Sequence, residues 1–330
     1  MVHSLGRCAS RFGVATRNAG TGASGRVDAP RCCESGGQSP DLTTRDLVAL
    51  ILLGVLWGAS FLFIRVAVPV LGPLPLVELR VALAVVALLV YGAIIGRLPK
   101  LRAHWRRFLI LGLVNSAIPF SLIAFAEIEL TASLAAILNS TTVLFTAVVA
   151  VVWTGETLTA GKAVGVVLGV AGVAALVGWD PVVVTGTVLL SVAAMLLASF
   201  SYALGATYVK RAFAGLPPLT MAVGQQAGAA MLLLVPAAVS LPEENVSLTA
   251  GISVLGLALL STAVAYILYF RLIENVGPTS TVTVTFLVPV FGLLFGVLVL
   301  GEPFGAGTLL GLAIILLSVA LDTGMLKRAK

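Results

Sequence analysis

The sequence is poor in charge. Only 10% of its 330 residues are Asp, Glu, Lys or Arg, against roughly 25% in a typical soluble domain. So few charges could not cover the surface of a water-soluble fold of this size, and 59% of the residues are hydrophobic. The composition therefore argues against a soluble domain and indicates a protein that lies in a lipid bilayer.

Cysteine, histidine and catalytic motifs are also scarce. The three cysteines, Cys8, Cys32 and Cys33, fall within the first 40 residues, so no disulfide framework holds the rest of the chain. No Cys/His cluster has zinc spacing, and we expect neither a metal nor a cofactor. The sequence contains no G-x-x-x-x-G-K-[ST], H-E-x-x-H or G-x-S-x-G, which argues against direct ATP use and against an enzyme.

Long apolar blocks are what the chain has instead. They run for about 18–22 residues, the length of a helix that crosses a bilayer core of roughly 30 Å, and strand-type alternation is absent. The sequence predicts an all-α polytopic membrane protein with ten transmembrane helices, at 47–68, 77–95, 108–126, 131–152, 161–179, 185–208, 219–240, 250–271, 279–300 and 305–322.

These spans divide the chain into four parts. Residues 1–46 are expected to form an N-terminal tail. Its first 40 residues are rich in Gly, Ser, Ala and Arg, and three interpretations stay open: a disordered cytoplasmic tail, a start codon placed too far upstream, or an organelle transit peptide. Residues 47–180 and 181–322 each hold five predicted helices, and residues 323–330 form a basic cytoplasmic tail.

Lys and Arg set the predicted orientation, because cytoplasmic loops carry the excess of both residues. With both termini inside, every basic loop residue is cytoplasmic and the outer loops hold only acidic ones. We therefore read the net charge of +6 as orientation in a bacterial cytoplasmic membrane rather than as affinity for nucleic acid. The inner set is Arg97, Lys100, Arg102, Arg106, Arg107, Lys162, Lys210, Arg211 and Arg271, and the outer set is Glu127, Glu129, Asp180, Glu243, Glu244 and Glu302.

One short phrase occurs in each half. VWTGETLTAG, ending at Gly161, returns as VLGEPFGAG, ending at Gly307, at an offset of 146 residues that pairs Glu156 with Glu302. Five helices is an odd number, so the second half would enter the membrane inverted. Inverted repeats of this kind rock about a midplane site and open it to alternate sides.

The chain also resembles a known family. WGASFLFIRVAV, FAEIELTASLAAILNSTTVLFTAVVAVVWTGETLTAGKAVGVVLGVAGVAAL and NVGPTSTVTVTFLVPVFGLLFGVLVLGEPFGAGTLLGLAIILLSVAL are similar to the EamA family of the drug/metabolite transporter superfamily. That resemblance implies an inverted five-helix repeat and the export or exchange of small polar metabolites such as amino acids. Members often carry a proline in helices 4 and 9, but here Pro289 has Val143 as its partner. Helix 4 is therefore expected to lack the kink of helix 9.

Polar groups near mid-span are the candidate substrate ligands, since a polar side chain in hydrocarbon is costly unless it faces a cavity or another helix. Asn139 pairs with Thr285 at the repeat offset, and Pro289 frees the carbonyl of Thr285. Hydroxyls that bond their own helix, and aromatics that pack or anchor at the interface, are the alternatives. The candidate set is Trp57, Asn115, Asn139, Thr142, Tyr202, Gln225, Tyr266, Thr281, Thr285 and Pro289.

Charged candidates fall into two groups. Arg65, Glu78 and Arg80 are expected near the outer boundary, as an ion pair such as Arg65 with Glu78, or as a gate or carboxylate anchor. Glu156 and Glu302 each follow a helix, where a carboxylate can accept N–H bonds from the start of the next one. Glycines at small-xxx-small spacing in 161–169 and 292–296 allow either an intramolecular contact or a homodimer face.

The sequence therefore favours a secondary transporter of small polar or amphipathic metabolites. Proton exchange and facilitated diffusion both stay open, with Glu78 and Glu129 the nearest acids to a proton path. A nucleotide-sugar or phosphorylated-sugar antiporter is the alternative within transport, although it should need several buried basic residues. A structural membrane protein without transport is the alternative of another class.

Overall fold

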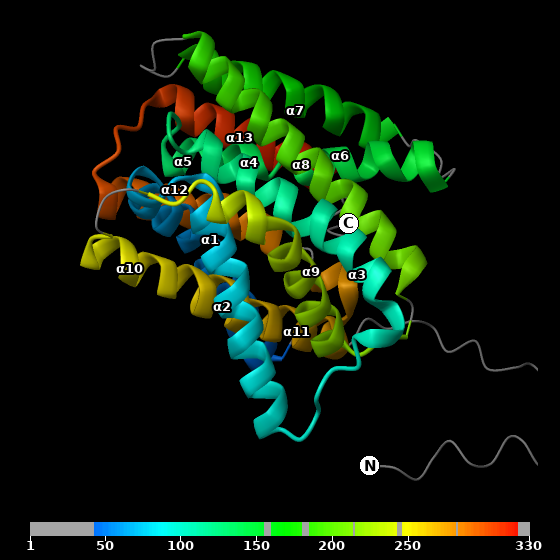
Figure 1. The fold of residues 1–330 in the computed structure, drawn as a ribbon. Helices are drawn as coiled ribbons and strands as arrows, with labels where there is room; N and C mark the ends of the chain where they lie inside the picture. The colour runs from blue at the N-terminus through cyan, green and yellow to red at the C-terminus, as the bar shows by residue number, and fades with distance from the viewer. Residues whose placement is uncertain are drawn as a thin grey trace, which may run out of the picture. The chain divides into compact units, whose positions relative to one another are not determined.

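The computed structural model describes residues 43–154, 160–179, 185–213, 215–242, 246–281 and 283–322. In these residues the chain is helical, as Figure 1 shows. The α-helices are α1 (Thr44–Leu71), α2 (Pro73–Ile94), α3 (Trp105–Gly112), α4 (Ile118–Ala126), α5 (Ala132–Asn139), α6 (Thr142–Val149), α7 (Ala160–Trp179), α8 (Gly186–Ala212), α9 (Pro218–Ala238), α10 (Leu248–Leu255), α11 (Ala265–Thr281), α12 (Val284–Leu300) and α13 (Ala306–Asp322). Wider π-helical turns join some of them, namely η2 (Leu113–Ala117), η3 (Ala150–Thr154) and η4 (Gly256–Val264), and a short 3₁₀ turn, η1 (Arg102–His104), precedes α3.

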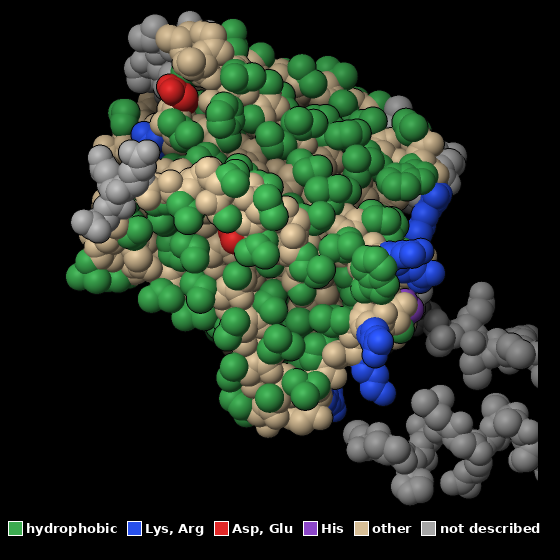
Figure 2. Space-filling model, viewed as in Figure 1, with side chains coloured by type: hydrophobic (Ala, Val, Ile, Leu, Met, Phe, Trp, Pro, Cys, Tyr) green, Lys and Arg blue, Asp and Glu red, His purple; other side chains and the backbone are tan. Residues whose placement is uncertain are grey.

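The helices suit a membrane. Among the described residues, 7 helical stretches are long and apolar enough to cross a bilayer, and three shorter apolar helices accompany them at Ala163–Leu176, Val284–Leu300 and Ala306–Leu321. Figure 2 shows apolar side chains over most of the visible face, with most of the visible basic ones gathered at one edge. Val235 and Leu298 leave 69% and 73% of their surface exposed, as side chains that face lipid would. The all-helical membrane architecture agrees with the sequence, while the ten inverted spans remain a prediction.

Several helix boundaries differ from the predicted ones. Residues 44–46, which the sequence assigned to the tail, form the first turn of α1, because the Thr43 hydroxyl caps it by accepting from the Asp46 backbone N–H. The turn predicted at 272–278 was wrong, since α11 continues to Thr281. Leu272 and Val276 lie one turn apart and are both buried, so the apolar face of this helix continues past Arg271, where charge suggested an end.

The predicted helix 4 is not one continuous α-helix. The predicted span 131–152 is interrupted between α5 and α6 without any proline. Three consecutive hydroxyls, Ser140, Thr141 and Thr142, donate to the carbonyls of Ile137, Leu138 and Asn139 respectively. Such side-chain bonds compete with the backbone hydrogen bonds of the helix. The three hydroxyls therefore explain the interruption, although residue 143 is valine and not proline.

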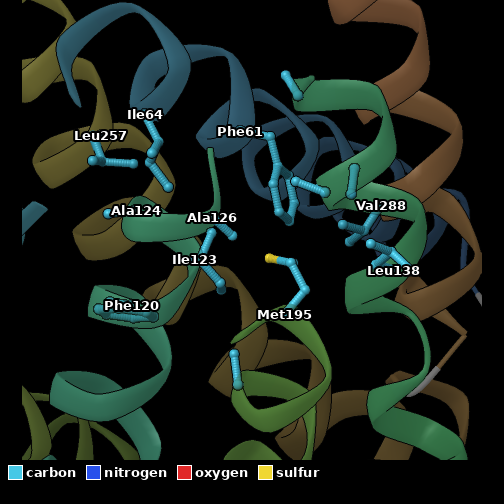
Figure 3. Close-up of a cluster of buried hydrophobic side chains, with 14 of the residues drawn as sticks. Phe61, Ile64, Phe120, Ile123, Ala124, Ala126, Leu138, Met195, Leu257 and Val288 are labelled. Atoms are coloured by element: carbon cyan, nitrogen blue, oxygen red, sulfur yellow. The ribbon is translucent and has the colours of Figure 1, made fainter. Parts of the chain in front are cut away.

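The two halves pack through corresponding helices. α7 lies against α13, α5 against α12, and α2 against α9, while α4 contacts α8 and α1 contacts α10 and α11. Figure 3 shows the apolar centre, where Phe61 of α1, Ile123 of α4, Met195 of α8 and Val288 of α12 converge. The core is therefore shared between the halves rather than divided into two.

Two glycines of α7 pack against other helices of the same chain. A Cβ on Gly169 would meet Leu144 and Ser318, and one on Gly161 would meet the Leu321 carbonyl at 3.4 Å. The structure thus uses these two positions for packing against α6 and α13, which is the intramolecular alternative of the two that the sequence left open.

Candidate substrate-binding site

Arg80 of α2 is the most unusual buried group of the described fold. It is 5% exposed, its Nε donates to Thr262 Oγ1 at 3.0 Å, and its guanidinium lies 3.6 Å from the centre of the Phe120 ring. Within the described residues it makes no hydrogen bond or ion pair with a carboxylate. A cation on a membrane helix without a counter-ion costs roughly 2.5–3.5 kcal/mol on insertion scales and is usually functional.

Arg80 lies deeper in its helix than the sequence predicted. The predicted helix began at residue 77, but α2 begins at Pro73, because proline is tolerated in the first helical turn. Arg80 is thus two turns inside the helix, roughly 10 Å from its start, and η4 and α4 cover it from two sides.

Gln225 of α9 is the centre of a second polar group. Its Nε2 donates to Ser116 Oγ and to the Tyr266 hydroxyl, both at 2.8 Å, and its Oε1 accepts from Asn115 Nδ2 at 3.0 Å. Gln225 is 5% exposed and Ser116 is fully buried. This network joins η2, α9 and α11, which are far apart in sequence.

Aromatic rings surround both polar groups. The Trp57 ring of α1 meets Tyr266 edge-on at 6.5 Å and lies 5.4 Å from Tyr269. On the other side, Tyr202 of α8 meets Phe120 edge-on at 6.2 Å. Five of the predicted residues therefore stand around one polar centre, namely Trp57, Asn115, Tyr202, Gln225 and Tyr266.

The contacts of this centre come in matched pairs. Arg80 bonds Thr262 across the halves as Gln225 bonds Ser116, and Arg80 contacts Phe120 within its half as Gln225 contacts Tyr266. The edge-on pairs Trp57–Tyr266 and Tyr202–Phe120 correspond in the same way. Equivalent residues are 145 apart (Trp57 and Tyr202, Arg80 and Gln225) or 146 apart (Ser116 and Thr262, Phe120 and Tyr266). The arrangement is built twice, but only one copy carries a charge.

A close helix crossing positions the Gln225 network. A Cβ on Gly112 would lie 2.5 Å from the backbone nitrogen of Ala229, and one on Gly228 would collide with the Phe108 carbonyl. Both glycines let α3 and α9 approach backbone to backbone. Asn115 follows Gly112 by three residues, inside the wide turn η2, and so reaches Gln225.

Arg65 and Glu78 are not paired among the described residues. Arg65 Nη1 donates to the backbone carbonyl of Glu127 and to that of Ile128 at 2.9 Å. The buried Oε2 of Glu78 has no hydrogen-bond partner within the described chain. Arg65 therefore binds the backbone at the end of α4 and does not form the predicted ion pair with Glu78.

Glu302 caps a different helix from the one predicted. Its carboxylate accepts from Ala132 N at 2.7 Å, Ser133 N at 3.0 Å and Ser133 Oγ at 2.6 Å. These groups start α5 in the first half, whereas the sequence pointed to α13, the next helix. The cap thus links the two halves. Glu156 lies outside the described residues.

The remaining candidates lie on α5, α6, α11 and α12. The hydroxyl of Thr142 donates to the Asn139 carbonyl, which is the helix-bonding alternative, and Asn139 Oδ1 is buried without a partner in the described chain. Thr281 ends α11, and Thr285 and Pro289 lie on α12. Among the described residues, no hydrogen bond joins Asn139 or Thr142 to Arg80.

Three residues of this centre were not predicted from the sequence, namely Phe120, Thr262 and Ser116, whereas Tyr269 was a possible path-lining residue beside Tyr202 and Tyr266. Ser116 and Thr262 are 146 residues apart, so the repeat offset, applied to the third helix of each half, was the signal that could have found them. The same offset pairs Phe120 with the predicted Tyr266, although Phe120 by itself looks like an ordinary apolar residue.

A cavity of about 670 Å³ opens on the basic edge, between α2, α9 and α11. Arg97 and Arg271 line it, and Arg271 Nη2 donates to the Tyr91 hydroxyl at 3.0 Å. An apolar layer of Leu88, Ala222, Val223 and Ala263 lies against Tyr266 and Ile267. Leu88 and Ala222 also line the cavity, so this layer separates the cavity from the polar centre.

Comparison with known proteins gives consistent results. The model of the family described as "EamA-like transporter family" matches residues 45–178 and again 189–323. The "Uncharacterized inner membrane transporter YedA" of Escherichia coli K12 is 29% identical over 290 residues, covering 83% of this chain and 89% of that protein. The "Uncharacterized transporter YvbV" of Bacillus subtilis is 24% identical over 84% of this chain and 91% of its own length. A solved structure titled "Crystal structure of protein" has the same fold, with a TM-score of 0.63 at 17% identity over 87% of this chain and 99% of that one.

Proposed function

We propose that this chain, which belongs to the EamA-like transporter family, is a secondary transporter that exports or exchanges small amphipathic metabolites such as amino acids. Its relatives are named as membrane transporters, and the helical membrane architecture suits that role. The observation that carries the substrate class is the buried guanidinium of Arg80, which has no carboxylate partner among the described residues.

A carboxylate is the group that such a site accepts best. Guanidinium N–H groups match a carboxylate in geometry and charge, and only Nε of Arg80 is used within the described protein. The rings of Trp57, Tyr202 and Tyr266 offer an apolar wall for the rest of the molecule, while Asn115 and Gln225 offer amide groups for polar substituents.

Alternating access is the proposed mechanism. The two family matches and the paired contacts around Arg80 and Gln225 support two repeats that meet at the site. In such carriers, the repeats move against one another around the fixed site. The cavity at Arg97 and Arg271 then serves as the inner approach, and the layer at Leu88 and Ala222 as the inner gate.

The two alternative functions require different features of the structure. A phosphorylated or nucleotide-linked sugar needs several buried cations, whereas Arg80 is the one Arg or Lys that is buried among the described side chains. A structural membrane protein without transport needs no buried, unpaired cation and would leave uptake into liposomes at background.

The test is uptake by the purified protein in proteoliposomes, with a panel of radiolabelled amino acids and sugars. We expect saturable exchange of one or more carboxylate-bearing compounds, lost in Arg80→Gln and retained in Arg106→Gln, because Arg106 is an exposed surface arginine. Uptake at background for every compound would contradict the function, and exchange that is unchanged in Arg80→Gln would contradict the site.

A further inference from the structure

Glu127 is a buried acid that neither the site nor the helix caps use. It follows α4 and is 0% exposed. Its backbone is fully engaged, since its N–H donates to Ile123 at 2.9 Å and its carbonyl accepts from Arg65. Yet neither carboxyl oxygen has a hydrogen-bond partner within the described chain. A buried carboxylate without donors loses its hydration with no compensation.

Three charged groups from three elements act on this carboxyl. Burial raises the pKa of Glu127 well above its usual range, the charges of Arg65 on α1 and Arg80 on α2 oppose that rise, and Glu302 after α12 adds to it. Burial outweighs both guanidinium groups because neither donates to the carboxyl oxygens. Glu302 differs from Glu127, since three donors of α5 satisfy it.

We propose that Glu127 is the proton-binding site of this carrier and that its proton is linked to the binding of an anion at Arg80. While Glu127 is neutral, the positive charge of Arg80 is available to a substrate carboxylate. When Glu127 loses its proton, its own charge offsets that of Arg80 and weakens the hold on the anion. By reciprocity, a bound anion strengthens the hold of Glu127 on its proton.

This inference rests on the proposed function and adds the coupling to it. The proton comes from water on the loading side and returns to water on the other, so one proton and one carboxylate-bearing substrate cross together. Substrate that leaves the cell down its gradient carries the proton out with it. The sequence named Glu129 as one of the nearest acids to a proton path. Its side chain is exposed, so burial does not favour its protonated form.

Two variants form a matched pair for the test. Glu127→Gln mimics the protonated acid and should keep anion binding, while Glu129→Gln removes an exposed carboxylate two residues away. The first measurement is an infrared titration of the full-length protein in lipid nanodiscs. We expect a protonated-carboxyl band that persists above the ordinary titration range of a glutamate, about pH 4.3, in the wild type and in Glu129→Gln, and its loss in Glu127→Gln. A band that is equal in all three proteins would overturn the proton site.

The second measurement is transport of the panel compounds under an imposed pH gradient. With the membrane potential held at zero, cotransport of one proton with each substrate molecule should accumulate substrate about tenfold per pH unit, because one pH unit is worth about 1.4 kcal/mol. We expect this accumulation in the wild type and in Glu129→Gln. Glu127→Gln should exchange substrate for substrate without accumulation.

The outcomes separate the two proposals. Accumulation that persists in Glu127→Gln would overturn the coupling and leave the transporter intact. If Glu127→Gln loses both exchange and accumulation, the coupling is also overturned, because Glu127 would then be needed for substrate binding or for folding. If no panel compound is carried by any variant, the proposed function fails, and the infrared band still decides whether Glu127 holds a proton.

Discussion

Arg80 and Gln225 occupy equivalent positions in the two halves of the chain, 145 residues apart. Each reaches across to a buried hydroxyl of the other half, Arg80 to Thr262 at 3.0 Å and Gln225 to Ser116 at 2.8 Å. The polar centre is therefore symmetric in shape and asymmetric in charge. That asymmetry gives the site one place for an anion rather than two.

The first prediction exchanges the two side chains. If the halves are equivalent, the double variant Arg80→Gln/Gln225→Arg places the guanidinium at the matched position, near Ser116 and Tyr266. We expect Arg80→Gln to lose flux by at least about tenfold, as when an interaction of about 1.4 kcal/mol is removed, and the double variant to recover part of it in proteoliposome exchange. A double variant as inactive as Arg80→Gln would argue against equivalent positions.

The second prediction concerns the crossing of α3 and α9. Gly112→Ala puts a methyl group 2.5 Å from the Ala229 nitrogen, so the helices must separate, and overpacking of this kind costs about 1–3 kcal/mol. We expect a lower unfolding temperature and weaker exchange, since Asn115 moves away from Gln225. Gly251→Ala is the matched control, because its added Cβ meets nothing within 4 Å. Equal stability of the two variants would rule out the close crossing.

The third prediction tests the cap between the halves. Glu302→Ala removes the acceptor of two backbone N–H groups and one hydroxyl at the start of α5. Loss of such a cap costs about 0.5–2 kcal/mol, so thermal unfolding should occur at a lower temperature, with the pH response of transport retained. Loss of that pH response at unchanged stability would instead assign Glu302 to proton transfer.

The fourth prediction is the pH dependence of stability. Because the pKa of Glu127 is raised in the folded state, the folded protein binds a proton that the unfolded chain has released above about pH 4.3. The contribution of this group to stability is full below that pH and is lost as pH rises through the folded pKa. Wild type should therefore lose stability relative to Glu127→Gln with rising pH, by up to about 1.4 kcal/mol per unit. A constant difference would contradict a raised pKa.

Sequence reasoning found the membrane helices because apolar blocks of spanning length need no tertiary information. It also selected Trp57, Asn115, Tyr202, Gln225 and Tyr266 as candidates, because a polar or amphipathic side chain deep in an apolar run must face protein rather than lipid, and the structure places these five together. The contacts among them depend on how helices cross, which only the fold supplies.

Two features of the site could not be read from the sequence. The predicted helix start at residue 77 put Arg80 in the first turn, although α2 begins at Pro73. Glu127 read as an outer-loop acid because it follows an apolar run, and only packing shows that it is buried. The turns η2 and η4 widen helices whose sequences look like ordinary apolar helix.

The central claim is that two inverted halves meet at the Arg80–Gln225 centre, and labelling with a membrane-impermeant maleimide tests it most directly. Ile95 and Ser240 are exposed, equivalent positions just after α2 and α9. Each is replaced by Cys in a protein that lacks Cys8, Cys32 and Cys33. In intact cells we expect labelling of Ser240→Cys alone, with Ile95→Cys reacting only after the membrane is opened. Labelling of both positions from the same side would contradict the account.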